Sequence, residues 1–129
     1  MPGPDELVFV YGTLKMGGLY HSVMREAGGI LLGTGVLAIP YPLVLSRYPC
    51  LLDQPGKGHQ VLGEVYRIPE VGGWVRLDCL EGHPREYRRR EETVHLGHRQ
   101  VQAWTYFYLQ ENYLEEGLVP VREFRAADR

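Results

Sequence analysis

Short apolar segments separated by glycine and proline turns limit this chain to a fold built mainly of β-strands. These segments are rich in β-branched and aromatic residues, as strands are. The expected strands are Leu7–Tyr11, Ile30–Ile39, Leu43–Leu45, Cys50–Leu52, His59–Ile68, Glu92–Leu96 and Val101–Tyr108. Strands and helices do not alternate regularly, so a doubly wound sheet is not expected. The pattern predicts an α+β fold with a curved, mostly antiparallel or mixed sheet.

Helix patterns occur in two places, Leu19–Ala27 and Pro69–Gly82. In the second helix, Trp74, Leu77 and Glu81 follow one another at spacings of three and four, which places them on one stripe of the helix surface. A stripe that carries tryptophan and leucine is expected to face the core. Glu81 is therefore expected to face inward.

An inward-facing carboxylate at the C-terminal end of a helix should have a raised pKa. Partial burial disfavours the charged form, and the negative end of the helix dipole acts in the same direction. Both effects raise the pKa of Glu81, which makes it a candidate general acid–base residue. A strained helix end or one half of a buried salt bridge is the structural alternative for this residue.

The first expected strand leads directly into the loop Tyr11-Gly12-Thr13-Leu14. A strand that ends in glycine and a small hydroxyl residue can turn sharply and point its backbone N–H groups into a cavity, where they hold a carboxylate or an oxyanion. The spacing required for a phosphate-binding P-loop is absent. The loop is thus either a candidate anion site or only a tight turn after the strand.

Length and charge set the expected size and partners of the protein. Its 129 residues, 44% hydrophobic and 23% charged, fit one globular domain over 1–129, with a core at about 7–108 and a polar C-terminal tail at 110–129. The formal net charge of -2 provides no basic footprint for nucleic acid or an anionic membrane. We therefore expect a small-molecule partner and a monomer or weak homodimer.

The localisation expected from the sequence is cytoplasmic. No apolar run approaches the length of a membrane span, and Met1–Glu6 lacks the basic and then apolar profile of a signal peptide. The two cysteines, Cys50 and Cys79, are too few for a disulfide framework and are expected to be reduced, mostly buried thiols.

Histidine and cysteine residues are the alternative candidates for reactive groups. Cys79 and His83 are four residues apart, but Pro84 follows at once and no third orienting residue is evident. His95 and His98 flank a turn, and their spacing matches no zinc site. The favoured interpretation is a solvated hairpin around that turn.

Three motifs together resemble the γ-glutamyl cyclotransferase-like superfamily. They are Tyr11-Gly12-Thr13-Leu14, the run Leu-Asp-Cys-Leu-Glu-Gly-His-Pro at 77–84, and Tyr87-x-Arg89. In this order and at these separations they are specific, and the resemblance extends from Leu7 to about Tyr108. The segments most similar to the γ-glutamylamine cyclotransferase branch are Tyr41–Val44, Leu51-Leu52 before Pro55-Gly56-x-Gly58, and Gly63–Tyr66.

The resemblance implies a small mixed, mostly antiparallel β-barrel with a few flanking helices. It also implies a cofactor-free and metal-free reaction in which the α-amine of a γ-glutamyl substrate attacks its own side-chain carbonyl. The products are 5-oxoproline and a free amine or amino acid. By this resemblance Glu81 is the general acid–base residue.

The resemblance also implies roles for the remaining candidate residues. Backbone groups of residues 11–14, namely Tyr11, Gly12, Thr13 and Leu14, would bind the glutamyl head, and the phenols of Tyr87 and Tyr106 lie near the cavity. Arg89 either belongs to the site or pairs with Glu64 or Asp78 as structural support.

Two other functions fit the same motifs. One is a non-catalytic protein of this fold that binds a small carboxylate, and the other is a γ-glutamyl amide hydrolase in which Glu81 activates water. The chain after Tyr108 is shorter than in animal members of the amine-specific branch, so the identity of the leaving amine is left open.

Overall fold

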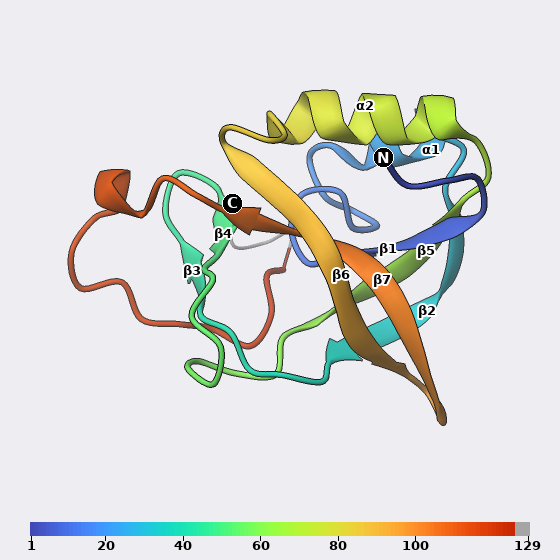
Figure 1. Cartoon of the computed structure of the whole chain (residues 1–129). Coiled ribbons are helices and arrows are strands. Elements are labelled where there is room, and N and C mark those ends of the chain that lie inside the picture. The colour runs from blue at the N-terminus through green and yellow to red at the C-terminus, as the bar shows by residue number, and fades with distance from the viewer. Residues whose placement is uncertain (126–129) are drawn as a thin grey trace.

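A five-stranded barrel forms the centre of the protein. The structure is a computed structural model and describes residues 1–125. The barrel consists of β1 (Glu6–Val10), β2 (Ile30–Leu37), β5 (Leu62–Ile68), β6 (Tyr87–Leu96) and β7 (Arg99–Tyr108), in the order β1-β5-β2-β6-β7 (Figure 1). The predicted α+β fold with a small barrel is confirmed.

The barrel is mostly antiparallel and closes through a single parallel contact. β1 and β2 both pair antiparallel with β5, while β6 pairs antiparallel with β2 and with β7. Val8 of β1 lies beside Trp104 of β7 in parallel register and closes the ring. Gly63 of β5 faces β1 so closely that a Cβ there would clash with the Val10 carbonyl oxygen. The absence of a side chain at Gly63 thus allows the two strands to approach closely.

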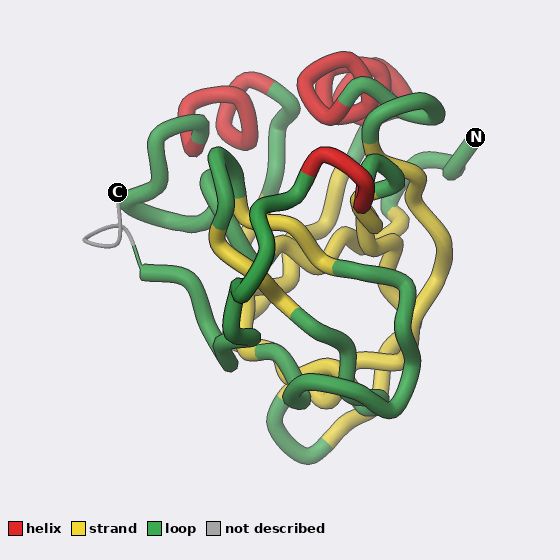
Figure 2. The backbone as a smooth tube through the Cα atoms, turned by 90° about the vertical axis from the view of Figure 1, so that its left-hand side faces the viewer, coloured by secondary structure: helices red, strands yellow, loops and turns green. Residues whose placement is uncertain are grey.

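Two helices, α1 (His21–Glu26) and α2 (Val71–Glu81), lie together over one side of the barrel (Figures 1 and 2). Trp74 and Leu77 of α2 are fully buried, which confirms the inward stripe. Gly82 ends α2 in the left-handed conformation, with φ 65°. Within the described residues, no helix combines the length and apolarity needed to cross a membrane.

A two-stranded hairpin and a short 3-10 helix extend the structure beside the barrel. β3 (Leu43–Leu45) pairs with β4 (Pro49–Leu51), and η1 (Glu111–Tyr113) follows β7. Leu114 and Leu118, just after η1, pack against buried residues of the hairpin. The segment after the barrel therefore covers one face of the hairpin.

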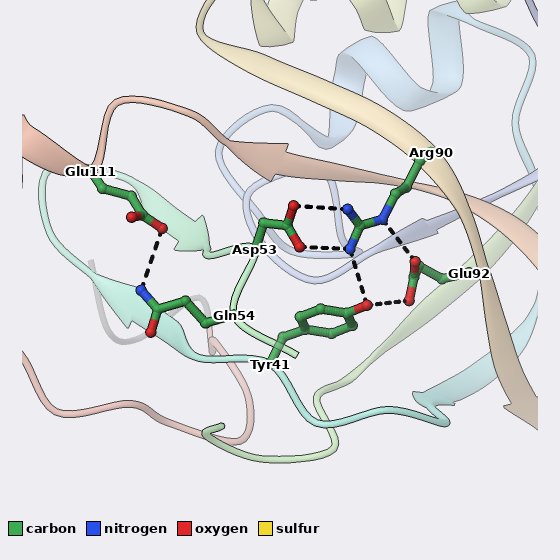
Figure 3. Close-up of polar contacts among 6 residues, drawn as sticks. All are labelled: Tyr41, Asp53, Gln54, Arg90, Glu92 and Glu111. Carbon is green, nitrogen blue, oxygen red and sulfur yellow. Dashed lines mark hydrogen bonds and ion pairs between the residues drawn. The ribbon is translucent and has the colours of Figure 1, made fainter. Parts of the chain in front are cut away.

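An ion-pair network holds the loop after β4 against β6 (Figure 3). The guanidinium of Arg90 donates to both carboxylate oxygens of Asp53, at 2.8 and 2.9 Å, and to Glu92 at 3.0 Å. The Tyr41 hydroxyl donates to Glu92 at 2.8 Å. Each polar group of the network thus has a partner, and the loop is fixed relative to the barrel.

The C-terminal segment returns to the barrel and contributes to the core. The Leu62 N–H donates to the carbonyl of Arg122 at 2.9 Å, and Val121 pairs with Leu43. Phe124 is 2% exposed and packs in the main core cluster. The core therefore extends beyond the predicted range of about 7–108, because one aromatic in a polar stretch fills a space between barrel and hairpin. Residues 126–129 of the predicted tail lie outside the described residues.

Replacing Phe124 with leucine is expected to lower the free energy of unfolding by about 1 to 2 kcal/mol, because the smaller side chain leaves a gap in a packed core. Urea denaturation measures this change. The Tyr113→Leu variant is the control, since Tyr113 is 78% exposed. An equal effect of the two substitutions would contradict the core position of Phe124.

Candidate active site

The loop after β1, the end of α2 and aromatic side chains of the barrel enclose a cavity of about 150 Å³. Its lining residues are Phe9, Val10, Tyr11, Gly12, Thr13, Leu14, Tyr20, Tyr48, Pro49, Leu80, Glu81, Glu86, Tyr87 and Tyr106. Seven of the eight candidate residues predicted from the sequence are in this lining, and Arg89 is the exception. The structure therefore brings together residues from three distant parts of the sequence.

The loop after β1 is held in a compact turn. The Lys15 N–H donates to the Gly12 carbonyl at 3.1 Å, and the Tyr20 N–H donates to the Thr13 carbonyl at 2.9 Å. Gly18 is needed for this closure because a Cβ there would clash with the Thr13 carbonyl oxygen. Among the described residues, no acceptor is found for the N–H groups of Gly12, Thr13 and Leu14. These cavity-lining groups are thus available as donors to a ligand.

Lys15 connects this loop to the C-terminal segment. Its ammonium donates to the Phe124 carbonyl oxygen at 2.5 Å. The loop is consequently held on one side by its own turn and on the other by the buried end of the chain.

Glu81 is the last residue of α2, and its carboxyl group has a strongly raised pKa. Burial raises the pKa of Glu81 to about 8, and the negative charges of Glu86 and Asp78 add to the effect. The rise and its main cause, burial, agree with the prediction, and the two nearby carboxylates are a further cause that the sequence did not reveal. Within residues 1–125, no ion pair or hydrogen bond engages the Glu81 carboxylate. The described residues therefore provide no partner for a buried salt bridge of Glu81.

The tyrosine hydroxyls around the cavity donate to protein acceptors. Tyr11 donates to the Tyr106 carbonyl at 2.6 Å, Tyr87 to the Pro49 carbonyl at 2.9 Å, and Tyr106 to the Asp78 carboxylate at 2.6 Å. Burial raises the pKa of each of these phenols, so all three stay protonated at neutral pH. They fix the walls, and their oxygens can still accept a hydrogen bond from a ligand.

Arg89 pairs with Asp78 rather than Glu64. Its Nε and Nη2 atoms each lie 2.9 Å from a carboxylate oxygen, and the two side chains are 7% and 13% exposed. The guanidinium also lies over the ring of Trp104, 5.2 Å from its centroid. Arg89 therefore supports the Asp78–Tyr106 wall of the cavity from behind, which is the structural role considered for it.

The cysteine and histidine side chains do not form a second reactive site among the described residues. Cys79 is exposed, so the expectation that both cysteines are buried holds only for Cys50. His83 accepts a hydrogen bond from the Arg89 N–H at 3.3 Å, and His95 and His98 are exposed at the β6–β7 turn. Among the described residues, no group of three or more His, Cys, Asp or Glu side chains could hold a metal ion.

Glu86, Tyr48 and Tyr20 line the cavity but were not predicted from the sequence. Glu86 follows α2 in a polar turn, where a carboxylate has no distinguishing pattern. Gly82, which reverses the chain after α2, is the one sequence signal that could have placed Glu86 near Glu81.

Comparison with known proteins identifies the family. The model of the family described as "Gamma-glutamyl cyclotransferase, AIG2-like" matches residues 8–126. The chain belongs to this family. Two relatives named γ-glutamylaminecyclotransferase, from Rattus norvegicus and Homo sapiens, are 43% and 41% identical over 64% and 70% of this chain. These matches cover 58% and 62% of the relatives' own lengths.

Solved structures support the same assignment. The crystal structure of an AIG2-like protein from Mus musculus superposes with a TM-score of 0.81 at 30% identity. The match covers 95% of this cyclotransferase-family chain and 89% of the mouse chain. Fold and family are thus established together.

Proposed function

We propose that this protein is a γ-glutamyl(amine) cyclotransferase that converts a γ-glutamyl compound into 5-oxoproline and a free amine or amino acid. The observation that carries the proposal is Glu81, a carboxylate with a pKa of about 8 that lines the same cavity as the loop of residues 11–14. A protein that only binds a small carboxylate gains nothing from a second carboxylate in its pocket.

The substrate carries its own nucleophile. The nitrogen of its α-amine forms a bond to the side-chain carbonyl carbon, the amide C–N bond of the same carbonyl breaks, and a five-membered ring is released. The enzyme needs to hold the substrate in the folded geometry and to move one proton from the attacking nitrogen to the leaving nitrogen.

Glu81 supplies the proton transfer. In its ionised form it takes a proton from the attacking amine, and the resulting carboxylic acid returns that proton to the departing amine. A pKa of about 8 suits both steps, because the residue gains and loses a proton near neutral pH.

Backbone donors of the loop stabilise negative charge. The N–H groups of Gly12, Thr13 and Leu14, which have no acceptor among residues 1–125, bind the substrate carboxylate or the oxyanion that forms as the ring closes. The fixed tyrosine walls, especially Tyr87 and Tyr106, orient the glutamyl chain between the loop and Glu81.

Incubation with a panel of γ-glutamyl amines and γ-glutamyl amino acids tests the proposal. We expect 5-oxoproline and the free leaving group in equal amounts from at least one substrate. Absence of product from every substrate would overturn the proposal in favour of a binding protein, and free glutamate would indicate hydrolysis.

The pH dependence of the reaction should report the Glu81 pKa. Because the ionised carboxylate acts as the base, kcat/KM is expected to rise with pH and level off above about pH 8. Replacing Glu86 with glutamine removes a negative neighbour and lowers the pKa of Glu81, so the rising limb should move to lower pH. Profiles normalised to their own plateaus measure this shift.

The Glu116→Gln variant is the control for the pH profile, since Glu116 is exposed and does not line the cavity. A limb that stays in place or moves to higher pH in Glu86→Gln would contradict the assignment of that limb to Glu81.

A further inference from the structure

The loop between β1 and α1, blue in Figure 1, has its carbonyl groups turned away from the cavity. The Gly12 carbonyl accepts from the Lys15 N–H at 3.1 Å, and the Thr13 carbonyl accepts from the Tyr20 N–H at 2.9 Å. In a trans peptide the carbonyl and the following N–H point in opposite directions. These two hydrogen bonds therefore also direct the N–H groups of Thr13 and Leu14, which line the cavity.

The donors to these carbonyls all belong to the returning segment of the loop, residues 15–21. His21, its last residue, adds a third bond, because its Nδ1 lies 2.9 Å from the Leu14 carbonyl oxygen. A carbonyl only accepts hydrogen bonds, so the imidazole carries the proton on Nδ1. The direction of the cavity-facing N–H groups thus depends on where the returning segment is held.

Glu64 of β5 holds the returning segment from behind. Its Oε1 atom accepts the Met16 N–H at 2.9 Å. Glu64 lies opposite Val10, the last residue of β1, in the β1–β5 ladder, so its carboxylate is next to the point where the loop leaves the barrel. The described residues that line the cavity do not include Glu64. Any effect of this carboxylate on a bound ligand therefore passes through the loop.

Tyr66 fixes the Glu64 carboxylate in turn. It lies two residues further along β5, on the same face of the strand, and its hydroxyl donates to the same Oε1 atom at 2.9 Å. The Tyr66 side chain is 2% exposed, and its ring lies 6.1 Å from the His21 ring. Burial raises the pKa of Tyr66, so the phenol remains a donor at neutral pH. The acceptor for Met16 is therefore held by a buried and rigid partner.

We propose that Glu64 is a positioning residue, which holds the returning segment through Met16 so that the N–H groups of Thr13 and Leu14 face the substrate. This inference rests on the proposed cyclotransferase function. The role requires an oxygen acceptor rather than a negative charge, because the group that Glu64 holds is a neutral backbone N–H. Glutamine keeps such an acceptor, and alanine does not.

The activities of three variants at pH 8 test this role. Glu64→Ala should lower kcat/KM for γ-glutamyl amines by at least about tenfold, since a displacement of about 1 Å in a site can cost about a hundredfold. Glu64→Gln should stay within about threefold of wild type, as one retained hydrogen bond implies. Tyr66→Phe removes the other hydrogen bond at Oε1 but keeps the one to Met16, and should also stay within about threefold. The rising limb of the Glu64→Ala pH profile should keep its position, because Glu81 and its carboxylate neighbours are unchanged.

Amide hydrogen exchange, followed by NMR, measures the loop itself without any turnover. The Tyr20 N–H reports the bond to the Thr13 carbonyl. Its exchange should become about fivefold faster or more in Glu64→Ala, the scale of one lost hydrogen bond, and should stay slow in Glu64→Gln and Tyr66→Phe.

Unchanged Tyr20 exchange or unchanged turnover in Glu64→Ala would overturn the inference. So would a loss in Tyr66→Phe equal to that in Glu64→Ala, since Glu64 would then only support Tyr66. A loss in Glu64→Gln equal to that in Glu64→Ala would overturn the acceptor role. Absence of 5-oxoproline from wild type with every substrate would overturn the proposed function instead, and the Tyr20 exchange rates would still decide whether Glu64 holds the loop.

Discussion

Replacing Glu81 with glutamine is expected to reduce kcat/KM for γ-glutamyl amines about a thousandfold, the usual scale for removing a general acid–base group. Glutamine keeps the shape of the side chain but cannot accept the proton of the attacking amine. Continuous detection of the released amine measures the loss. The Glu70→Gln variant, altered at the exposed start of the same helix, should retain wild-type activity.

The Glu81→Gln protein should remain folded, which separates a catalytic loss from a structural one. The folded-state pKa of about 8 lies above the ordinary value of 4.5, so the folded protein binds the proton more tightly than the unfolded chain. The wild-type stability therefore falls as pH rises from 4.5 to about 8, and glutamine removes this loss. A variant that is less stable than wild type at pH 8, or nearly as active, would contradict the role of Glu81.

Replacing Asp78 with alanine is expected to lower the free energy of unfolding by about 3 to 5 kcal/mol, the scale measured when one partner of a buried ion pair is removed. The substitution leaves the Arg89 guanidinium, 7% exposed, without its carboxylate partner. It also removes the acceptor of the Tyr106 hydroxyl. Urea denaturation at pH 7 measures the change.

A double variant, Asp78→Leu with Arg89→Met, should recover much of the lost stability, because it removes both charges together. The control is Glu26→Ala, which breaks the exposed Arg76–Glu26 pair and should cost less than about 1 kcal/mol. If Asp78→Ala and Glu26→Ala cost the same, the ion pair behind the cavity has no special structural role.

Much of the fold could be predicted from the sequence because strands, turns and helix faces depend on residues that are close together in the chain. Apolar segments and turn residues located at least part of every strand, although β6 begins at Tyr87 rather than at the predicted Glu92. The three-and-four spacing of Trp74, Leu77 and Glu81 located the inward face of α2. Barrel closure through Val8 and Trp104 joins residues far apart in the sequence, and it was expected only from the family resemblance.

Features that depend on contacts between distant parts of the chain could not be predicted from the sequence. Phe124 is an isolated aromatic in a polar stretch, and only the space between barrel and hairpin makes it a core residue. The effect of Glu86 on Glu81 arises where the chain reverses after α2. Periodicity carries no information about such arrangements.

The central claim is that the substrate's own amine, rather than water, breaks the γ-glutamyl bond. Turnover of a γ-glutamyl amine in ¹⁸O-labelled water, followed by mass spectrometry of the acidic product, tests this most directly. Intramolecular attack predicts 5-oxoproline without label in equal amount to the released amine. Free glutamate carrying ¹⁸O in its side-chain carboxylate would contradict the account and establish hydrolysis.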